Sequence, residues 1–151
     1  MIDQHAPDFS FTATSNLNAK LSHYQGRKVV LYFYPKDSTP GCTTESKDFT
    51  ELHDQFAQHD TVIFGISRDS LASHEKFKVK YQMPFELISD PDETICKLFD
   101  VIQLKKFMGR EYMGIERSTF VIDKDGMIRG EWRKVKVKGH AQAVLDIVEN
   151  L

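Results

Sequence analysis

The chain lacks the long apolar run that a membrane-spanning helix needs. None of its hydrophobic segments approaches the roughly 20 residues that cross a bilayer, and its first residues show neither the basic start nor the apolar core of a secretory signal. Cysteine is scarce as well, because two among 151 residues do not make a disulfide framework of the secreted type. We therefore predict a cytoplasmic protein that does not bind membranes.

The sequence also has little net charge. Its 20 Lys and Arg against 22 Asp and Glu leave a formal charge of −2, so no global field would attract nucleic acid or anionic lipid. The richest basic stretch, 133–138, alternates Lys with Val along most of its length, which is more typical of a solvated strand face than of a binding patch. Repeats, low-complexity tracts and linkers are lacking too, and the length predicts one domain over residues 1–151.

Two kinds of chemistry find little support in the residues present. A dithiol oxidoreductase of the thioredoxin type needs Cys-x-x-Cys, whereas this chain reads Cys42-Thr43-Thr44-Glu45. None of the six histidines forms a tight ligand pair with a cysteine, as a zinc site would require. We therefore expect neither a metal nor an organic cofactor.

Apolar periodicity indicates an α/β fold. Continuous β-favouring runs at 29–34 and 62–66 are typical of strands buried on both faces. A helical stripe through Phe49, Leu52 and Phe56 lies between them and completes a βαβ unit. The other predicted elements are a strand around Phe9 and Phe11, a helix over 70–81, a strand over 85–88, a short helix over 93–99, a hairpin of 119–122 and 127–132 around an Asp-Gly turn, and a last helix from 141. This order predicts a thioredoxin-like fold, with a mixed central sheet flanked by helices on both faces.

The segment 35–45 carries the strongest chemical signal. It joins the end of a predicted buried strand to the start of a helix, and Pro40 suits the first helical turn, where its missing N–H loses no hydrogen bond. Cys42 would then lie in that turn, near unpaired N–H groups and the positive end of the helix dipole. Because the thiolate is the nucleophilic form of cysteine, this placement favours a reactive thiol over a merely buried one.

The residues around Cys42 resemble the active-site signature of the peroxiredoxins. The spacing Pro35-x-x-x-Thr39-x-x-Cys42 matches that signature. The wider string 34–43 is similar to the bacterioferritin comigratory protein, or peroxiredoxin Q, subfamily, and so are 89–92, 107–109 and 113–123 in their order and spacing. The resemblance covers nearly the whole chain. It implies an enzyme that reduces hydrogen peroxide and organic hydroperoxides at the expense of thiols.

The resemblance implies a role for each residue of the signature. Cys42 would attack one peroxide oxygen and become a sulfenic acid. Thr39 would orient the peroxide through its hydroxyl and hydrogen-bond the sulfur, and by its position it is also a helix N-cap. Pro35 would shield the thiolate from water. Arg117, which without the resemblance would read as a surface strand arginine, would favour the thiolate and bind the developing oxyanion.

Two further residues are expected to support this chemistry. Glu45 stands one helical turn past Cys42 and would position Arg117. Backbone N–H groups near Gly41 and Cys42 would help to hold the negative charge, as in an oxyanion hole.

The second cysteine does not stand where many relatives carry a resolving one. Lys47 occupies the position five residues after Cys42, and the predicted helix 70–81 contains no cysteine. Cys96 lies among apolar neighbours, which is more typical of a buried structural cysteine. We therefore predict a one-cysteine cycle, in which an external thiol (thioredoxin, glutaredoxin or glutathione) reduces the sulfenic acid.

One alternative stays open, namely a non-enzymatic holdase or redox-sensing binding protein on the same scaffold. The sequence shows no exposed apolar patch that would favour it, and loss of peroxide consumption on replacing Cys42 would separate the two functions. Relatives of this type are often monomeric, and no feature argues for a large ring. We expect a monomer or a weak dimer.

Overall fold

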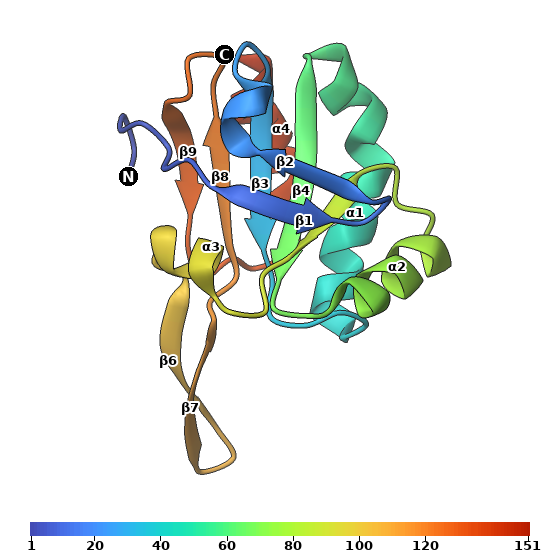
Figure 1. The fold of residues 1–151 in the computed structure, drawn as a ribbon, viewed down its shortest axis with the longest axis vertical. Helices are drawn as coiled ribbons and strands as arrows, with labels where there is room; N and C mark the ends of the chain where they lie inside the picture. Colours follow the sequence, from blue (N-terminus) through green and yellow to red (C-terminus); the bar gives the residue numbers. More distant parts are fainter.

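A mixed sheet of seven strands forms the centre of the computed structural model, which describes residues 1–151 (Figure 1). The strand order is β2-β1-β5-β4-β3-β8-β9. The three middle strands β5, β4 and β3 run parallel, while β1 and β2 on one side and β8 and β9 on the other pair antiparallel. The strands are β1 (Ser10–Ala13), β2 (Leu17–Lys20), β3 (Lys28–Phe33), β4 (Thr61–Ser67), β5 (Glu86–Ser89), β8 (Ser118–Ile122) and β9 (Ile128–Trp132).

Burial on both faces explains the continuous apolar run of β3. Leu31 and Phe33 belong to one core cluster, and Val30 and Tyr32 belong to a second cluster on the opposite face of the sheet. Every residue of β3 is buried, as the uninterrupted β-favouring sequence predicts for a strand covered on two sides. The C-terminal end of this strand leads into the loop that precedes the first helix.

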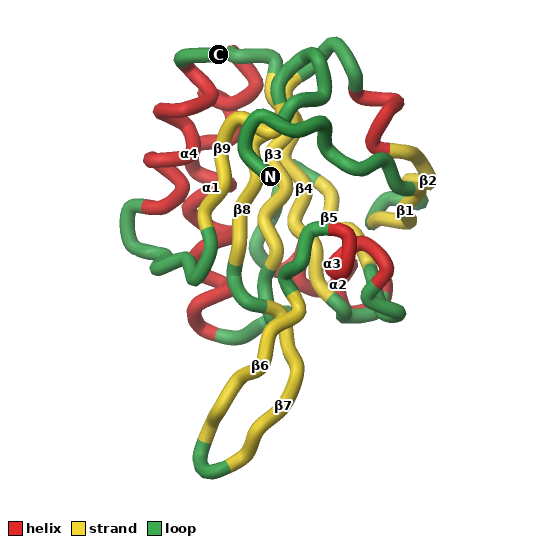
Figure 2. The backbone as a smooth tube through the Cα atoms, turned by 90° about the vertical axis from the view of Figure 1, so that its left-hand side faces the viewer, coloured by secondary structure: helices red, strands yellow, loops and turns green.

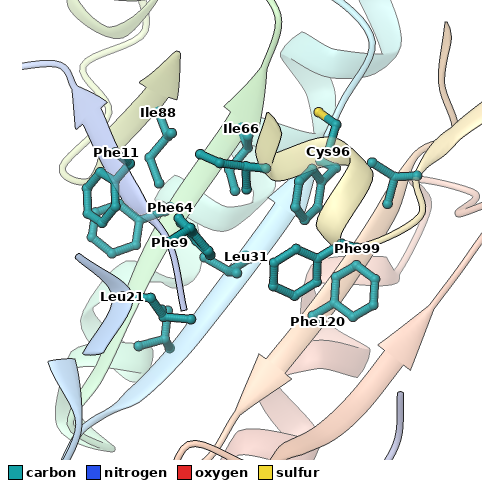
Figure 3. Packing of buried hydrophobic residues seen from close by; sticks show 14 of the residues in the cluster. Phe9, Phe11, Leu21, Leu31, Phe64, Ile66, Ile88, Cys96, Phe99 and Phe120 are labelled. Carbon is teal, nitrogen blue, oxygen red and sulfur yellow. The ribbon is translucent and has the colours of Figure 1, made fainter. Parts of the chain in front are cut away.

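Helices cover the two faces unequally. The helices α1 (Pro40–Gln58), α2 (Leu71–Lys80) and α4 (His140–Glu149) contribute their buried side chains to one cluster. The short helix α3 (Thr94–Leu98) and the 3-10 turn η1 (Leu21–Tyr24) lie on the other face, where phenylalanines fill the space against the sheet (Figure 3). The predicted thioredoxin-like α/β fold is confirmed. The helices α2 and α3 lie within one residue of the predicted bounds 70–81 and 93–99, and α4 begins one residue before the predicted 141.

A second sheet of two strands stands apart from the body. It consists of β6 (Ile102–Phe107) and β7 (Arg110–Ile115), which extend away from the rest of the chain as a hairpin (Figures 1 and 2). Met108 and Gly109 join them with positive φ angles of 52° and 78°, as a tight two-residue hairpin turn requires. No strands are predicted here from the sequence, because a hairpin with both faces in solvent shows no apolar alternation.

Two other predictions differ from the structure. The basic stretch 133–138 is not a strand, because β9 ends at Trp132 and the chain continues as a loop toward α4. The edge strand β2 has no sequence counterpart among the predicted elements, since its four residues alternate only between half-buried and exposed positions. None of the helices is long and apolar enough to span a bilayer.

Candidate active site

Cys42 occupies the third position of α1, beyond the C-terminal end of β3. Its side chain is only 1% exposed. The first hydrogen bond of the helix runs from the Thr43 N–H to the Thr39 carbonyl at 2.9 Å, so the N–H groups of Gly41 and Cys42 come before the helical ladder. The sulfur therefore lies at the end of the helix where the partial positive charge gathers.

Arg117 reaches this helix end from the two-residue link between β7 and β8. Its Nη2 donates to the Cys42 Sγ at 3.2 Å, and its Nη1 donates to the Glu45 Oε1 at 2.6 Å. Gly41 makes room for the guanidinium, because a Cβ at this position would lie 3.2 Å from Nη2. The structure thus brings together Cys42, Arg117, Glu45 and Gly41, from two segments more than 70 residues apart.

The guanidinium lies between a thiol and a carboxyl group that are both out of water. Glu45 is 1% exposed and its Oε2 has no hydrogen-bond partner. Burial raises the pKa of Glu45 from 4.5 to about 7, although Arg117 opposes the rise. Burial also disfavours the charge of Arg117, but Glu45 and Cys42 outweigh it and hold the pKa of Arg117 above its ordinary value. A fixed positive charge therefore stays against the sulfur across the physiological pH range.

Thr39 and Pro35 lie on the loop between β3 and α1, and both are half-buried. Thr39 has the extended backbone of an N-cap residue, but its hydroxyl donates to the Lys36 carbonyl at 2.8 Å rather than capping the helix. It is this carbonyl, and not the Cys42 sulfur as expected, that takes the hydroxyl proton. The Thr39 oxygen therefore keeps its lone pairs for accepting a hydrogen bond.

A buried polar network behind this loop has no counterpart among the predicted site residues. Asp37 accepts hydrogen bonds from Tyr34 Oη at 2.6 Å and Ser73 Oγ at 2.8 Å, its Oδ2 lies 2.7 Å from His74 Nδ1, and its own N–H donates to Asp69 at 2.9 Å. Ligand atoms of Asp37, Asp69 and His74 lie within 4.8 Å of one another, close enough to hold a metal ion. All three side chains are already hydrogen-bonded within the protein, so the network connects the loop before α1 to α2.

Two more titratable groups, His140 and Lys105, lie near Arg117. Burial and Arg117 lower the pKa of His140 to about 4, so His140 is neutral at physiological pH, and its Nε2 lies 2.7 Å from Thr119 Oγ1. Lys105 on β6 is half-buried, and burial followed by Arg117 lowers its pKa while Cys42 raises it. Neither His140 nor Lys105 belongs to a recognisable sequence motif. Only the folded chain brings them near Arg117.

Cys96 lies on the other side of the sheet from Cys42. It is completely buried on α3 in the cluster of phenylalanines shown in Figure 3, whereas Cys42 belongs to the cluster on the opposite face. Burial, with a contribution from Asp90, raises the pKa of Cys96 well above its ordinary value. This sulfur is therefore a thiol at neutral pH, and it does not face the sulfur of Cys42.

The sequence is similar to that of known peroxiredoxins. The profile of the AhpC/TSA family matches residues 2–131. The peroxiredoxin Bcp of Bacillus subtilis is 51% identical over 150 residues, which cover 99% of this chain and 96% of the relative. The Escherichia coli peroxiredoxin Bcp is 36% identical over 141 residues, covering 93% of this chain and 90% of the relative.

Solved structures show the same likeness in three dimensions. The bacterioferritin comigratory protein of Xanthomonas campestris, studied for its alkyl peroxide reduction activity, superposes with a TM-score of 0.90 at 44% identity, covering 94% of this chain and 90% of that one. A cysteine-to-serine mutant of PrxQ from Xylella fastidiosa gives a TM-score of 0.94 at 40% identity, covering 99% and 96% of the two chains.

Proposed function

The chain belongs to the AhpC/TSA family, in its bacterioferritin comigratory protein or peroxiredoxin Q subfamily, and is a thiol-dependent peroxidase; on this premise we propose that Cys42 is the thiol that peroxide oxidises. The observation that carries the proposal is the 3.2 Å contact between Arg117 Nη2 and the Cys42 sulfur at a helix N-terminus. A cation and a helix end both stabilise the thiolate, which is the nucleophile.

In the oxidative step, the Cys42 thiolate attacks one oxygen of the hydroperoxide. A sulfur–oxygen bond forms while the O–O bond breaks, so that sulfur loses two electrons and the peroxide gains them. The sulfur becomes a sulfenic acid, and the other oxygen leaves as hydroxide or alkoxide and takes up a proton. Arg117 and the N–H groups of Gly41 and Cys42 stabilise the charge that moves onto the oxygens, and each such donor is worth about 10²–10³ in rate.

The remaining predicted site residues orient the peroxide, limit the access of water and hold Arg117 in place. Thr39 accepts a hydrogen bond from the O–H of the peroxide, because its own proton is held by the Lys36 carbonyl. Pro35 has no N–H to offer and limits the access of water to the sulfur. Glu45 fixes the guanidinium through the 2.6 Å hydrogen bond that its Oε1 accepts, so that Nη2 stays directed at the sulfur.

The reductive step uses an external thiol and a single cysteine of the chain. The thiol attacks the sulfenic sulfur, a mixed disulfide forms and water leaves; a second thiol then releases Cys42. The burial of Cys96 on the opposite face of the sheet supports this one-cysteine cycle. Thioredoxin, glutaredoxin or glutathione would supply the thiols, and the substrates are hydrogen peroxide and organic hydroperoxides. A cytoplasmic location and a monomeric or weakly dimeric state complete the proposal.

Matched serine variants of the two cysteines test this function. Cys42→Ser removes the nucleophile and should abolish peroxide consumption with dithiothreitol as the reductant. Cys96→Ser leaves the nucleophile in place and should turn over nearly as fast as the wild type. Persistent turnover in Cys42→Ser would move the chemistry to another residue. Loss of turnover in a normally folded Cys96→Ser would make Cys96 the resolving cysteine.

A further inference from the structure

Exposed apolar side chains gather on the projecting hairpin. Eleven large hydrophobic residues of the chain are exposed, and five of them lie on β6, β7 or the turn between them, with 47% to 86% of their surface open to solvent. We call these five the hairpin surface: Leu104 and Met113 share one face of the two-stranded sheet, Phe107 and Tyr112 share the other, and Met108 lies in the turn. Such a concentration of apolar area on one projecting element is typical of a protein-binding site.

The hairpin also carries a positive net charge. Residues 102–115 contain Lys105, Lys106 and Arg110 against Glu111 alone, a net charge of +2 in a chain whose total is −2. Glu111 is paired with Lys106 at 3.5 Å, so the other two cations have no carboxylate partner within salt-bridge distance. Lys105 is paired across the strands with Tyr112, and Arg110 with Phe107, so the two cations lie among the exposed apolar side chains. Such a mixture of apolar and positive groups fits a partner whose contact face is apolar and acidic.

The base of the hairpin is part of the active site. Arg117 follows the last residue of β7 by two positions and contacts the Cys42 sulfur. Lys105 extends over Gly114, where its Cδ would lie 3.3 Å from a Cβ, and it is close enough to Arg117 and Cys42 for both to influence its ionisation. A molecule that approaches Cys42 from the side of Arg117 and Lys105 therefore contacts the hairpin.

The reductive step requires a second molecule to approach Cys42. No second cysteine faces Cys42, so the electrons that return the sulfenic acid to the thiol come from another molecule. A small thiol needs no surface for this step, whereas a protein thiol has to be oriented before its sulfur can reach one that is 1% exposed.

We propose that the hairpin surface, together with Lys105 and Arg110, docks a protein dithiol reductant that is apolar and acidic around its reactive thiol. This inference rests on the proposed function, because it takes Cys42 as the oxidised residue. The docked thiolate attacks the sulfenic sulfur, a mixed disulfide forms and hydroxide leaves to become water. The second thiol of the partner then attacks the partner's own sulfur, so that the partner leaves oxidised and the Cys42 thiolate is restored.

Two other occupants fit the hairpin less well. A second copy of the chain would place one positive hairpin against another in a symmetric contact, which repulsion disfavours. Hydrogen peroxide or a short-chain hydroperoxide would not reach the tip, because the six residues of β7 span about 20 Å at the usual rise per strand residue. Phe107 and Met108 at the tip thus lie beyond the reach of a small substrate held at Cys42.

Variants of the hairpin tip test the proposal in three separate reactions. Phe107→Ser combined with Met108→Ser removes apolar area, Arg110→Glu reverses a charge, and Val79→Ser on α2 is the control for loss of an exposed apolar side chain elsewhere. We would measure oxidation of the enzyme by hydrogen peroxide in a single turnover, steady-state turnover with dithiothreitol, and the KM for a bacterial thioredoxin. Both hairpin variants should raise that KM about tenfold or more and leave the first two rates unchanged, while Val79→Ser should change nothing.

The outcomes distinguish this proposal from the assignment of Cys42. An unchanged KM for thioredoxin, measured also with a glutaredoxin, would overturn docking at the hairpin while leaving Cys42 as the oxidised residue. Slower single-turnover oxidation in the tip variant would overturn it too, because the hairpin would then serve the substrate. A wild-type dimer that the tip variant dissociates, seen by sedimentation, would assign the hairpin to self-association. Failure of the wild type to form a sulfenic acid on Cys42 would instead refute the proposed function.

Discussion

Replacing Glu45 by Gln should change how the stability of the protein depends on pH. Burial raises the pKa of Glu45 from 4.5 to about 7, against the opposing effect of Arg117. A carboxyl group with a raised pKa binds its proton more tightly in the folded chain. Its contribution to the free energy of unfolding is therefore fully present below pH 4.5 and is lost as the pH rises to 7. The loss amounts to about 3 kcal/mol at about 1.4 kcal/mol per pH unit.

His140 hides this dependence in the wild type. Burial and Arg117 lower the pKa of His140 from 6.5 to about 4, so its contribution is fully present above pH 6.5 and is lost as the pH falls to 4. This loss is also about 3 kcal/mol, and it has the opposite sign. Between pH 4.5 and 6.5 the two groups therefore nearly cancel, and only a variant of one of them reveals the other.

Equilibrium unfolding in urea, measured every half unit from pH 4.5 to 7.5, tests this reasoning. The free energy of unfolding of Glu45→Gln minus that of the wild type should increase by about 3 kcal/mol across this range, whatever its absolute value, because all other groups are common to both. Glu51→Gln, an exposed glutamate on the same helix, is the matched control and should show a far smaller trend. A difference for Glu45→Gln that stays constant to within about 1 kcal/mol would refute the buried, proton-binding carboxyl.

Two further changes follow from the loop before α1. Thr39→Val removes the oxygen that accepts a hydrogen bond from the peroxide and should slow sulfenic acid formation in stopped-flow experiments by about a hundredfold. Thr39→Ser keeps the hydroxyl and should keep most of the rate. Equal rates for the two variants would show that the hydroxyl has no role. Asp37→Ala removes the oxygens that accept from Tyr34 and Ser73 and that contact His74, and it should lower the free energy of unfolding by about 3 kcal/mol in urea titrations. A loss of a few tenths would show that the network is dispensable.

The central part of the fold can be predicted from sequence because burial leaves a strong pattern there. The run 29–34 and the helical stripe through Phe49 and Phe56 reflect elements packed on two sides or one. The hairpin of β6 and β7 is not predicted, because its residues are largely exposed and leave no such pattern. Leu104 opposes Met113 and Lys106 opposes Glu111 on one face that is open to solvent, so apolar and charged residues mix along the same strands.

The site is predictable only in its local part. Glu45 follows Cys42 by three residues on one helix, and their proximity needs no knowledge of the fold. Arg117 is 75 residues away from Cys42, and only the resemblance to a family selects it among the other basic residues. The contact between Asp37 and His74 spans 37 residues and has no sequence signal, since it depends on how α2 packs beside the loop. The proton of Thr39 also goes to a local carbonyl that no motif specifies.

The most direct test of the account is the rate at which hydrogen peroxide converts Cys42 to the sulfenic acid at neutral pH, measured by stopped flow in the wild type, Arg117→Lys and Arg117→Met. The guanidinium both contacts the sulfur and stabilises the charge that moves onto the oxygens. We therefore expect Arg117→Met to react about 10²–10³ times more slowly, with Arg117→Lys between the two. If folded Arg117→Met reacts at the wild-type rate, the positive charge beside the sulfur is not what makes Cys42 reactive.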